Sequence, residues 1–155
     1  MTAADSIPGL RRARAEDAAR VTALVRAAYG KYVARIGREP KPMTADYAHA
    51  IAAHQFWVVE ENQALIAALE LIPGPDHLLV ENIAVDPARQ GRGLGRKLMA
   101  FAEAETRRQA QNELRLYTNE RFTENIALYE RIGFRETHRE PFKGTHAVYM
   151  SKQVR

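Results

Sequence analysis

Glycines and cations crowd one short stretch of the chain, DPARQGRGLGRKL at residues 86–98. Gly91, Gly93 and Gly95 alternate there with arginine and leucine, after the apolar run HLLVENIAV and before a sequence that favours a helix. The first N–H groups of a helix have no partner within it, and the helix dipole gives that end about half a positive charge. Glycine carries no Cβ, so a phosphate group can approach the backbone closely. We therefore predict an anion site at this loop.

The spacing of the glycines excludes two common phosphate-binding loops. A dinucleotide fingerprint needs G-x-G-x-x-G, but counting from Gly91 or Gly93 places arginine or leucine at the last position. A Walker loop needs G-x-x-x-x-G-K-[ST], and Arg96 occupies the place of its second glycine. What remains is Q-x-x-G-x-G, from Gln90 to Gly95. A glycine-rich turn with solvated arginines is the alternative, but three glycines beside four cations favour an anion.

The helices expected around this loop follow from the spacing of apolar residues. From Val21 to Ala28 they recur at i, i+3, i+4 and i+7, which is typical of an amphipathic helix. Thr44 is expected to cap a short helix after a Gly/Pro-rich break, and Gly133 to follow the end of the last one. Helices are predicted over residues 16–35, 45–54, 94–110 and 125–132.

Strands are predicted where short apolar or alternating runs lie between turn residues. They cover residues 9–14, 55–62, 64–74, 77–85, 113–119, the stretch from 134 onward and 146–154. The resulting order, β-α-α-β-β-β-α-β-α-β-β, predicts an α/β fold in which helices flank a mixed central β-sheet. The step through residues 78–118 is expected to be a right-handed parallel crossover. With 155 residues and no repeat or linker, we expect a single domain over residues 1–155.

The composition narrows the chemistry. The absence of cysteine excludes disulfides, thiolate metal sites and a cysteine nucleophile, and the five histidines lack metal-binding spacing, so no metal is expected. The N-terminus has no apolar signal core and no apolar run approaches the roughly 18 residues of a membrane span, so we expect a cytoplasmic protein without membrane contact. The net charge of +4, from 23 cations and 19 anions, is mostly interspersed. This pattern favours solvated faces over a specific nucleic-acid surface.

Two motifs resemble those of a known family. Q-G-R-G-L-G, after a strand that ends in I-A-V-D-P, resembles the acyl-CoA motif of the GNAT superfamily of N-acetyltransferases. The stretch N-I-A-L-Y-E-R-I-G-F, residues 125–134, resembles that family's second core motif. The two motifs lie about thirty residues apart, as a crossover helix requires, and the order of elements agrees over almost the whole chain. The resemblance implies a GNAT-like fold and acetyl-CoA as cofactor.

The resemblance also implies which residues bind the cofactor. Its pyrophosphate is expected on the N–H groups of the glycine loop, and its pantetheine arm along the preceding strand, which splays from the next one. Many members read Asn-x-x-Ala/Ser-Ile-x-Leu-Tyr, but Phe122 holds the usual asparagine's place here, so Asn119 or Asn125 could replace it. The expected cofactor-binding residues are Ile83, Ala84, Val85, Gln90, Gly91, Arg92, Gly93, Leu94, Gly95, Arg96, Asn119, Asn125, Leu128 and Tyr129.

By the same resemblance, Tyr129 is the acid that protonates the departing thiolate. It lies four residues after Asn125, so both side chains share one helix face. A phenol with a pKa of about 10 can hydrogen-bond and protonate a thiolate whose intrinsic pKa is about 8.5. The alternative is a core aromatic residue between Leu128 and Ile132.

Glu81 is the candidate base and a candidate contact for the acceptor amine. Strand alternation places it on the face of Ile83 and Val85, while Asn82 points the opposite way and is expected to be structural. A carboxylate among aliphatic groups has a raised pKa, so it could accept a proton directly or through water. Two alternatives stay open: Glu81 bonds a loop N–H group, or it points into a wet cleft and helps to hold a cationic substrate.

The acceptor in this family enters over the connection between the first two helices, here residues 29–43. Tyr29 and Tyr32 lie three residues apart and Arg35 follows, so the three could bind an amine that carries a carboxylate. The alternative is an ordinary amphipathic helix end whose tyrosines reach the surface.

The sequence therefore predicts an N-acetyltransferase that moves an acetyl group from acetyl-CoA to a primary amine of a small molecule, by direct attack in a ternary complex. A protein or peptide acceptor is the second hypothesis, and a non-catalytic acyl-CoA sensor is the third. A nucleic-acid module built on the basic loop is expected to bind only weakly and without specificity. The last predicted strand, HAVYMSKQV at residues 146–154, could supply an edge for a homodimer.

Overall fold

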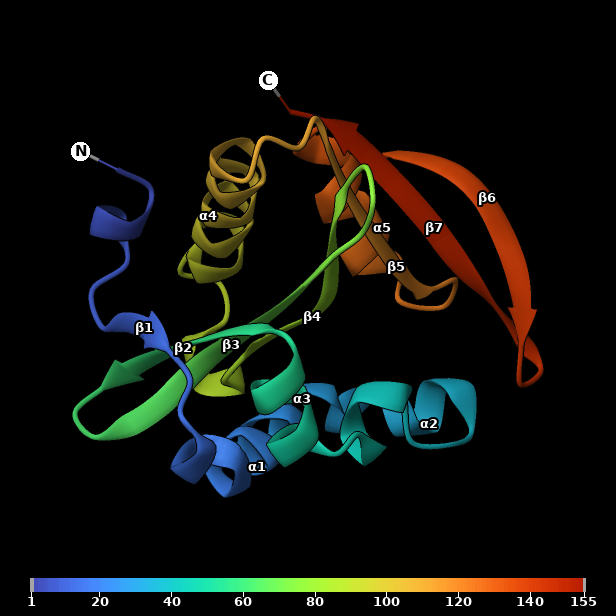
Figure 1. Ribbon diagram of the computed structural model, residues 1–155. Coiled ribbons are helices and arrows are strands. Elements are labelled where there is room, and N and C mark those ends of the chain that lie inside the picture. The colour runs from blue at the N-terminus through green and yellow to red at the C-terminus, as the bar shows by residue number, and fades with distance from the viewer. Residues whose placement is uncertain (1, 155) are drawn as a thin grey trace.

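The computed structural model describes residues 2–154 as a mixed sheet with helices on both faces (Figure 1). The strand order is β1-β2-β3-β4-β5-β7-β6; β4 and β5 run parallel and the other neighbours run antiparallel. The predicted α/β fold is confirmed. The strands are β1 (Leu10–Arg12), β2 (Gln55–Glu61), β3 (Ala64–Pro73), β4 (Leu78–Val85), β5 (Glu113–Asn119), β6 (Arg135–Phe142) and β7 (Thr145–Gln153).

Helices α1, α2 and α3 cover one face of the sheet, and α4 and α5 cover the other (Figure 1). The predicted first helix is interrupted, because a 3-10 turn at Gly30–Tyr32 separates α1 from α2. The cap of α3 is Asp46, whose Oδ1 accepts from the N–H of His49 at 3.1 Å; Thr44, the predicted cap, ends a preceding 3-10 turn instead. The helices are α1 (Ala18–Tyr29), α2 (Val33–Ile36), α3 (Tyr47–Ala53), α4 (Leu94–Arg108) and α5 (Thr123–Arg131).

The sheet separates two apolar cores. On one face, Leu98 and Phe101 of α4 pack with residues of β3, β4 and β5. On the other, Val21 and Val25 of α1 pack with residues of β2, β3 and α3. Because β3 is covered on both faces, its residues from Leu65 to Leu71 are all buried, which explains its nearly continuous apolar run.

A β-bulge in β4 positions the site. Glu70 of β3 pairs with Asn82, and the next residue, Leu71, pairs with Val80, so Glu81 is an extra residue in β4. Among the described residues, β4 pairs with β5 only as far as Val80, and the two strands then separate (Figure 1). The splay that the resemblance implied is therefore present, and one edge of β4 is left without a strand partner from Glu81 to Val85.

The C-terminal strands differ from the prediction in one respect. The strand HAVYMSKQV, expected at an edge, is β7 and pairs with both β5 and β6. The edge at this end of the sheet belongs to β6, in which every residue is exposed. None of the helices within residues 2–154 is long and apolar enough to cross a membrane.

Asp17 ties β1 to the start of α1. Its fully buried carboxylate accepts from the guanidinium of Arg11 at 2.8 and 3.0 Å, from Arg20 at 3.0 Å and from the N–H of Arg14 at 2.7 Å. The hydrogen bonds from Arg11 hold the pKa of Asp17 well below its usual value. The ionised carboxylate is thus a structural group.

We expect Asp17→Asn to lower the free energy of unfolding by about 3 kcal/mol at pH 7, because it leaves a buried polar network without its anion. A lowered folded-state pKa stabilises above the unfolded value of about 3.9 and is lost as pH falls through the folded value, so the gap to wild type should narrow below about pH 4. Urea unfolding at pH 3 and pH 7 measures this. Glu16→Gln, which removes an exposed partner of Arg14, is the control and should change little. Equal stabilities of Asp17→Asn and wild type at pH 7 would contradict the assignment.

Candidate active site

The loop before α4 presents unbonded N–H groups at the helix N-terminus. Gly93 precedes the helix with a φ of 78°, in the left-handed region. Within residues 2–154, the N–H groups from Gly93 to Arg96 donate no hydrogen bond. A Cβ added at Gly91 or Gly93 would meet no atom within 4 Å. The backbone at this end of α4 is therefore open to an anion.

The cations of this loop differ in their partners. The guanidinium of Arg89 lies 2.9 Å from Glu61 and 3.5 Å from Asp86, which corrects the expectation that all four cations are free to attract an anion. Arg92, Arg96 and Lys97 are exposed and form no ion pair with any residue of the described chain. These three cations, unlike Arg89, can add attraction for an anion at the helix N-terminus.

Two other residues of the predicted cofactor set make internal contacts. The side-chain amide of Gln90 donates to the carbonyl of Val85 at 3.1 Å, and its Oε1 lies 3.5 Å from Nζ of Lys31. Leu94 borders a separate small cavity of about 160 Å³ beside residues 6–8. The side chain of Gln90 thus holds the loop against the end of β4.

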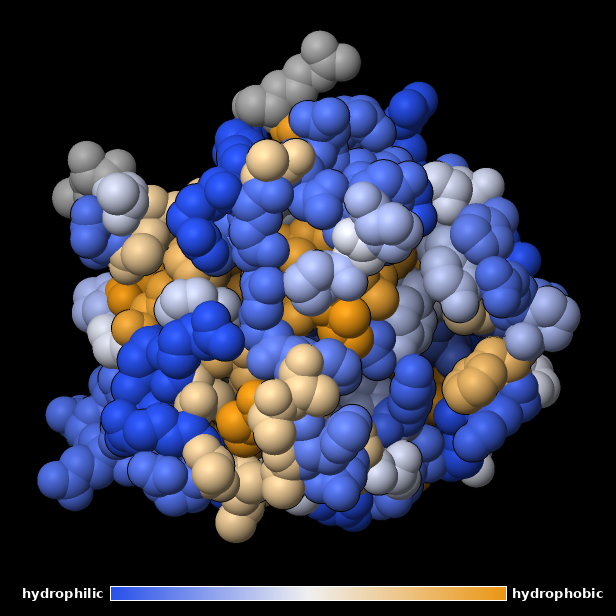
Figure 2. All heavy atoms as spheres, in the orientation of Figure 1, coloured by the Kyte–Doolittle hydropathy of each residue, from blue (hydrophilic) through white to orange (hydrophobic). Residues whose placement is uncertain are grey.

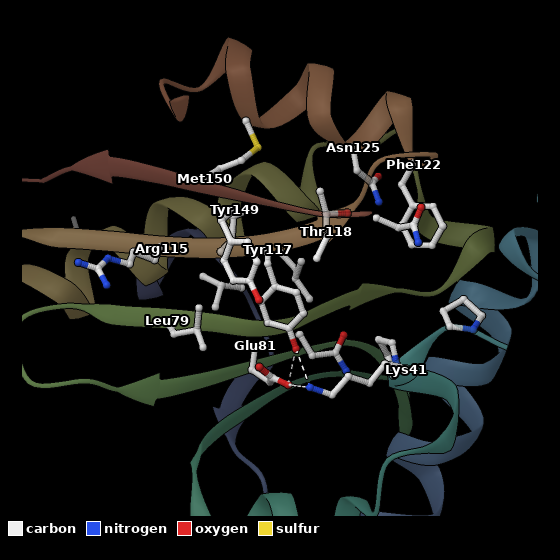
Figure 3. A pocket seen from close by; sticks show the side chains of 18 of the residues that line it. Lys41, Leu79, Glu81, Arg115, Tyr117, Thr118, Phe122, Asn125, Tyr149 and Met150 are labelled. Atoms are coloured by element: carbon white, nitrogen blue, oxygen red, sulfur yellow. Dashed lines mark hydrogen bonds and ion pairs between the residues drawn. The ribbon is translucent and has the colours of Figure 1, made fainter. Parts of the chain in front are cut away.

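A larger cleft, of about 780 Å³, opens where β4 and β5 separate (Figure 3). The two strands line it together with residues 36–45 on one side and the β6–β7 hairpin on the other. On the face shown in Figure 2, apolar residues reach the surface near the middle, surrounded by hydrophilic ones. Of the predicted site residues, the cleft is lined by Tyr29, Glu81, Ile83, Asn119, Asn125 and Tyr129.

Glu81 lies in the β4 bulge, and its carboxylate has polar partners. The hydroxyl of Tyr117 donates to Oε2 at 2.8 Å, and Nζ of Lys41 lies 3.4 Å from the same oxygen (Figure 3). The ammonium group of Lys41 also donates to the Tyr117 hydroxyl at 3.0 Å. The predicted aliphatic surroundings of Glu81 are therefore wrong: it belongs to a polar triad in the cleft.

Because of the bulge, residues of β4 face different sides of the sheet from those predicted. Ile83, which also borders the cleft, and Val85 pack against the core on the α4 side, whereas the Glu81 carboxylate turns to its polar partners in the cleft. Asn82 does not point away from the cleft; it lines it too, and its side chain donates to the hydroxyl of Tyr47 at 2.9 Å. An extra residue interrupts the two-residue alternation of a strand, so a strict alternation fails here.

Tyr129 of α5 places its ring in the core and lines the cleft. It is 8% exposed, and its ring centroid lies 6.0 Å from that of Phe134. Its hydroxyl has no hydrogen-bond partner among the described residues. Burial raises the pKa of Tyr129 above its usual value, so the phenol keeps its proton at neutral and mildly alkaline pH. The side chain is both a core aromatic and an available proton donor.

The two candidate asparagines have different surroundings. Asn119 donates to Oγ1 of Thr145 at 2.9 Å and accepts from the N–H of Arg121 at 2.9 Å, so its amide stabilises the loop after β5. Asn125 has one long contact, 3.4 Å from the Tyr32 hydroxyl to its Oδ1. Its NH₂ group makes no hydrogen bond within the described chain. The geometry favours Asn125 for contact with a ligand. The remaining residue of this set, Leu128, is half-buried on α5 and does not line the cleft.

The three residues expected to bind an acceptor carboxylate are engaged elsewhere. The Tyr29 hydroxyl lies 3.0 Å from the carbonyl of Ile83. The buried ring of Tyr32 stacks on the ring of Phe122, the N-cap residue of α5, with 3.9 Å between the two centroids. Arg35 pairs with Glu124 at 2.7 Å, and neither it nor Tyr32 lines the cleft. Arg35 was predicted to bind the carboxylate of the acceptor, but in this structure it binds the carboxylate of Glu124 instead.

The sequence analysis missed three polar residues of the cleft: Lys41, Tyr117 and Glu70. Glu70 is 5% exposed, and its Oε2 lies 2.6 Å from Nδ1 of His54. Burial raises the pKa of Glu70 above its usual value. The sequence carried a signal for Glu70, because it is a glutamate inside the otherwise apolar run ALIAALELIP. Burying a charged side chain in a strand is costly, so such a residue often has a specific role.

A family model described as an acetyltransferase (GNAT) domain matches residues 52–136, more than half of the chain. The chain therefore belongs to the GNAT acetyltransferase family. A mycothiol acetyltransferase from Streptosporangium roseum is 42% identical over 52 residues, which are 34% of this chain and 15% of that protein. The aligned part thus spans less than a fifth of that relative's length.

Solved structures share the fold at low sequence identity. The PaiA N-acetyltransferase of Thermoplasma acidophilum, in complex with coenzyme A, matches with a TM-score of 0.80 and 19% identity over 94% of this chain and 98% of that one. The ribosomal-protein-S18-alanine N-acetyltransferase of Escherichia coli matches with a TM-score of 0.76 and 22% identity over 94% and 92%. At these identities the matches show a common architecture and leave the chemistry of this chain to its own residues.

A pair of glycine substitutions tests the loop geometry. Gly93→Ala should lower the free energy of unfolding by about 1–2 kcal/mol, because a Cβ is strained at its positive φ. Gly95→Ala is the matched control: that φ is not positive, and the nearest atom to its added Cβ is Val85 Cγ2 at 4.0 Å. It should be neutral or stabilise by about 0.5 kcal/mol, as alanine does in a helix. Urea unfolding measures both, and equal effects of the two substitutions would contradict the described loop.

Proposed function

We propose that this protein is an N-acetyltransferase that moves an acetyl group from acetyl-CoA to a primary amine by direct attack in a ternary complex. The observation that carries the proposal is the edge of β4 that has no strand partner within residues 2–154, which runs from the Glu81 bulge toward the unbonded N–H groups of α4. The chain has no cysteine to form a thioester intermediate, so direct attack is the simple route.

The residues present fit a coenzyme A molecule. The N–H groups from Gly93 to Arg96 would hold its pyrophosphate, with Arg92 nearby. The edge of β4 at residues 83–85 would bind the amides of its pantetheine arm, which would replace the bonds that Tyr29 and Gln90 donate to the carbonyls there. When bound, acetyl-CoA supplies the activated acetyl group and a thiolate that can leave. Titration calorimetry with CoA tests this fit: we expect micromolar binding that weakens as salt rises, and no heat at millimolar CoA would overturn it.

Tyr129 supplies the proton to the leaving thiolate in this proposal. We expect Tyr129→Phe to lower kcat by about 100-fold or more while the Kd for CoA changes little, because proton transfer by a positioned group typically contributes 10²–10⁴-fold. Since burial raises its pKa, wild-type activity should show no alkaline loss from Tyr129 below about pH 10. Tyr149→Phe, in another tyrosine of the cleft, is the control. Unchanged turnover of Tyr129→Phe would remove the role.

Glu81 is the group that accepts the amine's proton, directly or through water. Its Oε2 is held by Tyr117 and Lys41, which leaves Oε1 available to the cleft. We expect Glu81→Gln to lower kcat/KM by about 100-fold at pH 7 and by less at pH 9, where more of the amine is already neutral. Glu113→Gln, in a cleft glutamate held by Arg115 and Ser151, should keep near-normal activity. A deficit that does not vary with pH would contradict the assignment.

A small amine fits the cleft better than a protein segment does. The guanidinium of Arg38 lies 5.2 Å from the ring centroid of Phe142, so residues 36–45 meet the tip of the β6–β7 hairpin across the cleft. This contact narrows the path that an extended peptide would need. A protein or peptide acceptor is the alternative, and a non-catalytic acyl-CoA sensor is a further one.

An acceptor panel separates these hypotheses. Thiol release from acetyl-CoA would be measured with tyramine, putrescine, L-lysine and a hexapeptide that begins with alanine. We expect turnover with at least one small amine and less with the peptide. Faster turnover of the peptide would favour a protein acceptor, and binding of acetyl-CoA without turnover of any amine would favour the sensor.

A further inference from the structure

We propose that Glu70 and His54 form a proton path that carries the proton lost by the acceptor amine from the cleft to solvent. This inference rests on the acetyltransferase function proposed above. It concerns two residues that the chemistry at Glu81 and Tyr129 leaves unused, although one of them is a buried carboxylate in the wall of the same cleft.

The pair spans the distance from the cleft to the surface. The Glu70 side chain is 6% exposed and lines the cleft, while that of His54 is 27% exposed and lies at the C-cap of α3. Oε2 of Glu70 and Nδ1 of His54 are 2.6 Å apart. Oε1 of Glu70 and Nε2 of His54 make no hydrogen bond within residues 2–154. The pair therefore has one free polar atom at each end.

The groups around Glu70 favour proton uptake. The titratable neighbours are Glu81 on β4, Lys41 in the turn before α3, His54 itself, Tyr47 of α3 and Tyr117 of β5. Burial raises the pKa of Glu70, the charge of Glu81 acts in the same direction, and His54 and Lys41 oppose it. A carboxylate with a raised pKa holds a proton more readily near neutral pH than an exposed glutamate does.

The transfer balances within the pair. The resting pair holds two protons, one shared between Oε2 of Glu70 and Nδ1 of His54 and one on Nε2 of His54. As the N–H bond of the acceptor ammonium breaks, its proton moves from Glu81 through water to Oε1 of Glu70, and the shared proton moves fully to Nδ1. The imidazolium then releases its Nε2 proton to solvent, so one proton enters, one leaves, and the charge of the pair is restored. Rotation of the carboxyl group and of the imidazole ring returns the two remaining protons to their first positions.

A purely structural role would be different. The contact also ties the end of α3 to β3, so loss of either side chain could lower stability and activity together. Such a loss would be the same at every pH. A proton path matters only while the amine arrives charged, so its loss should matter less as pH approaches the amine's own pKa, about 10 for an alkylamine.

The test compares His54→Gln with His49→Gln in the full-length protein. His49 lies on the same helix, its ring centroid is 6.4 Å from that of His54, and it pairs with no carboxylate of the described chain. The acceptor is the panel amine with the highest kcat/KM. We expect His54→Gln to lower kcat/KM about tenfold at pH 7 and little at pH 9.5, whereas His49→Gln stays near wild type.

Two further readouts keep the test independent of folding. His54→Ala should regain activity when imidazole is added, and more with the more basic 4-methylimidazole; Glu70→Gln should show the same pH-dependent deficit. Thermal unfolding of each variant reports stability separately. A deficit that is constant with pH, equal effects at His49 and His54, or no rescue would overturn the proton path. Absence of wild-type turnover with every amine would instead overturn the proposed function.

Discussion

The extra residue in β4 is the constraint on which the rest of the site depends. A bulge bends its strand and ends regular pairing, and here it ends the ladder to β5 at Val80. The backbone beyond it keeps its bonds to β3 on one edge and, in the described part of the chain, has no strand partner on the other. The same bulge turns Glu81 into the cleft, where Tyr117 and Lys41 fix its carboxylate. The bulge in β4 thus both separates β4 from β5 and orients the Glu81 carboxylate.

The two faces of the sheet contribute different parts. On the α4 side, the helix N-terminus lies next to the end of β4 and offers N–H groups and two arginines that have no partner within residues 2–154. On the other side, residues 36–45 and the β6–β7 hairpin enclose a polar cleft, in which nearly every charge has a partner of opposite sign. Under the proposed function, such a site would bind a phosphate at one end and a polar reactant at the other, with the opening between β4 and β5 connecting them.

The sequence predicted the parts of this arrangement that depend on local rules. The spacing of glycines at the mouth of α4, the apolar stripes of the helices and the continuous apolar run of β3 follow from short-range geometry. The facing of Glu81 did not, because a bulge is defined by pairing with another strand and leaves no mark in the periodicity. Arg35 and Arg89 were expected to be free, but their partners, Glu124 and Glu61, lie 89 and 28 residues away in the sequence. The Glu70–His54 pair likewise joins two elements.

A crystal structure of the protein with CoA tests the central claim most directly. The account predicts that the pantetheine amides bond to the free edge of β4 beyond the Glu81 bulge, with the diphosphate on the N–H groups that begin α4 and the sulfur within hydrogen-bonding distance of the Tyr129 hydroxyl. A complex in which β4 and β5 pair along their full length, or in which the nucleotide lies away from α4, would contradict it.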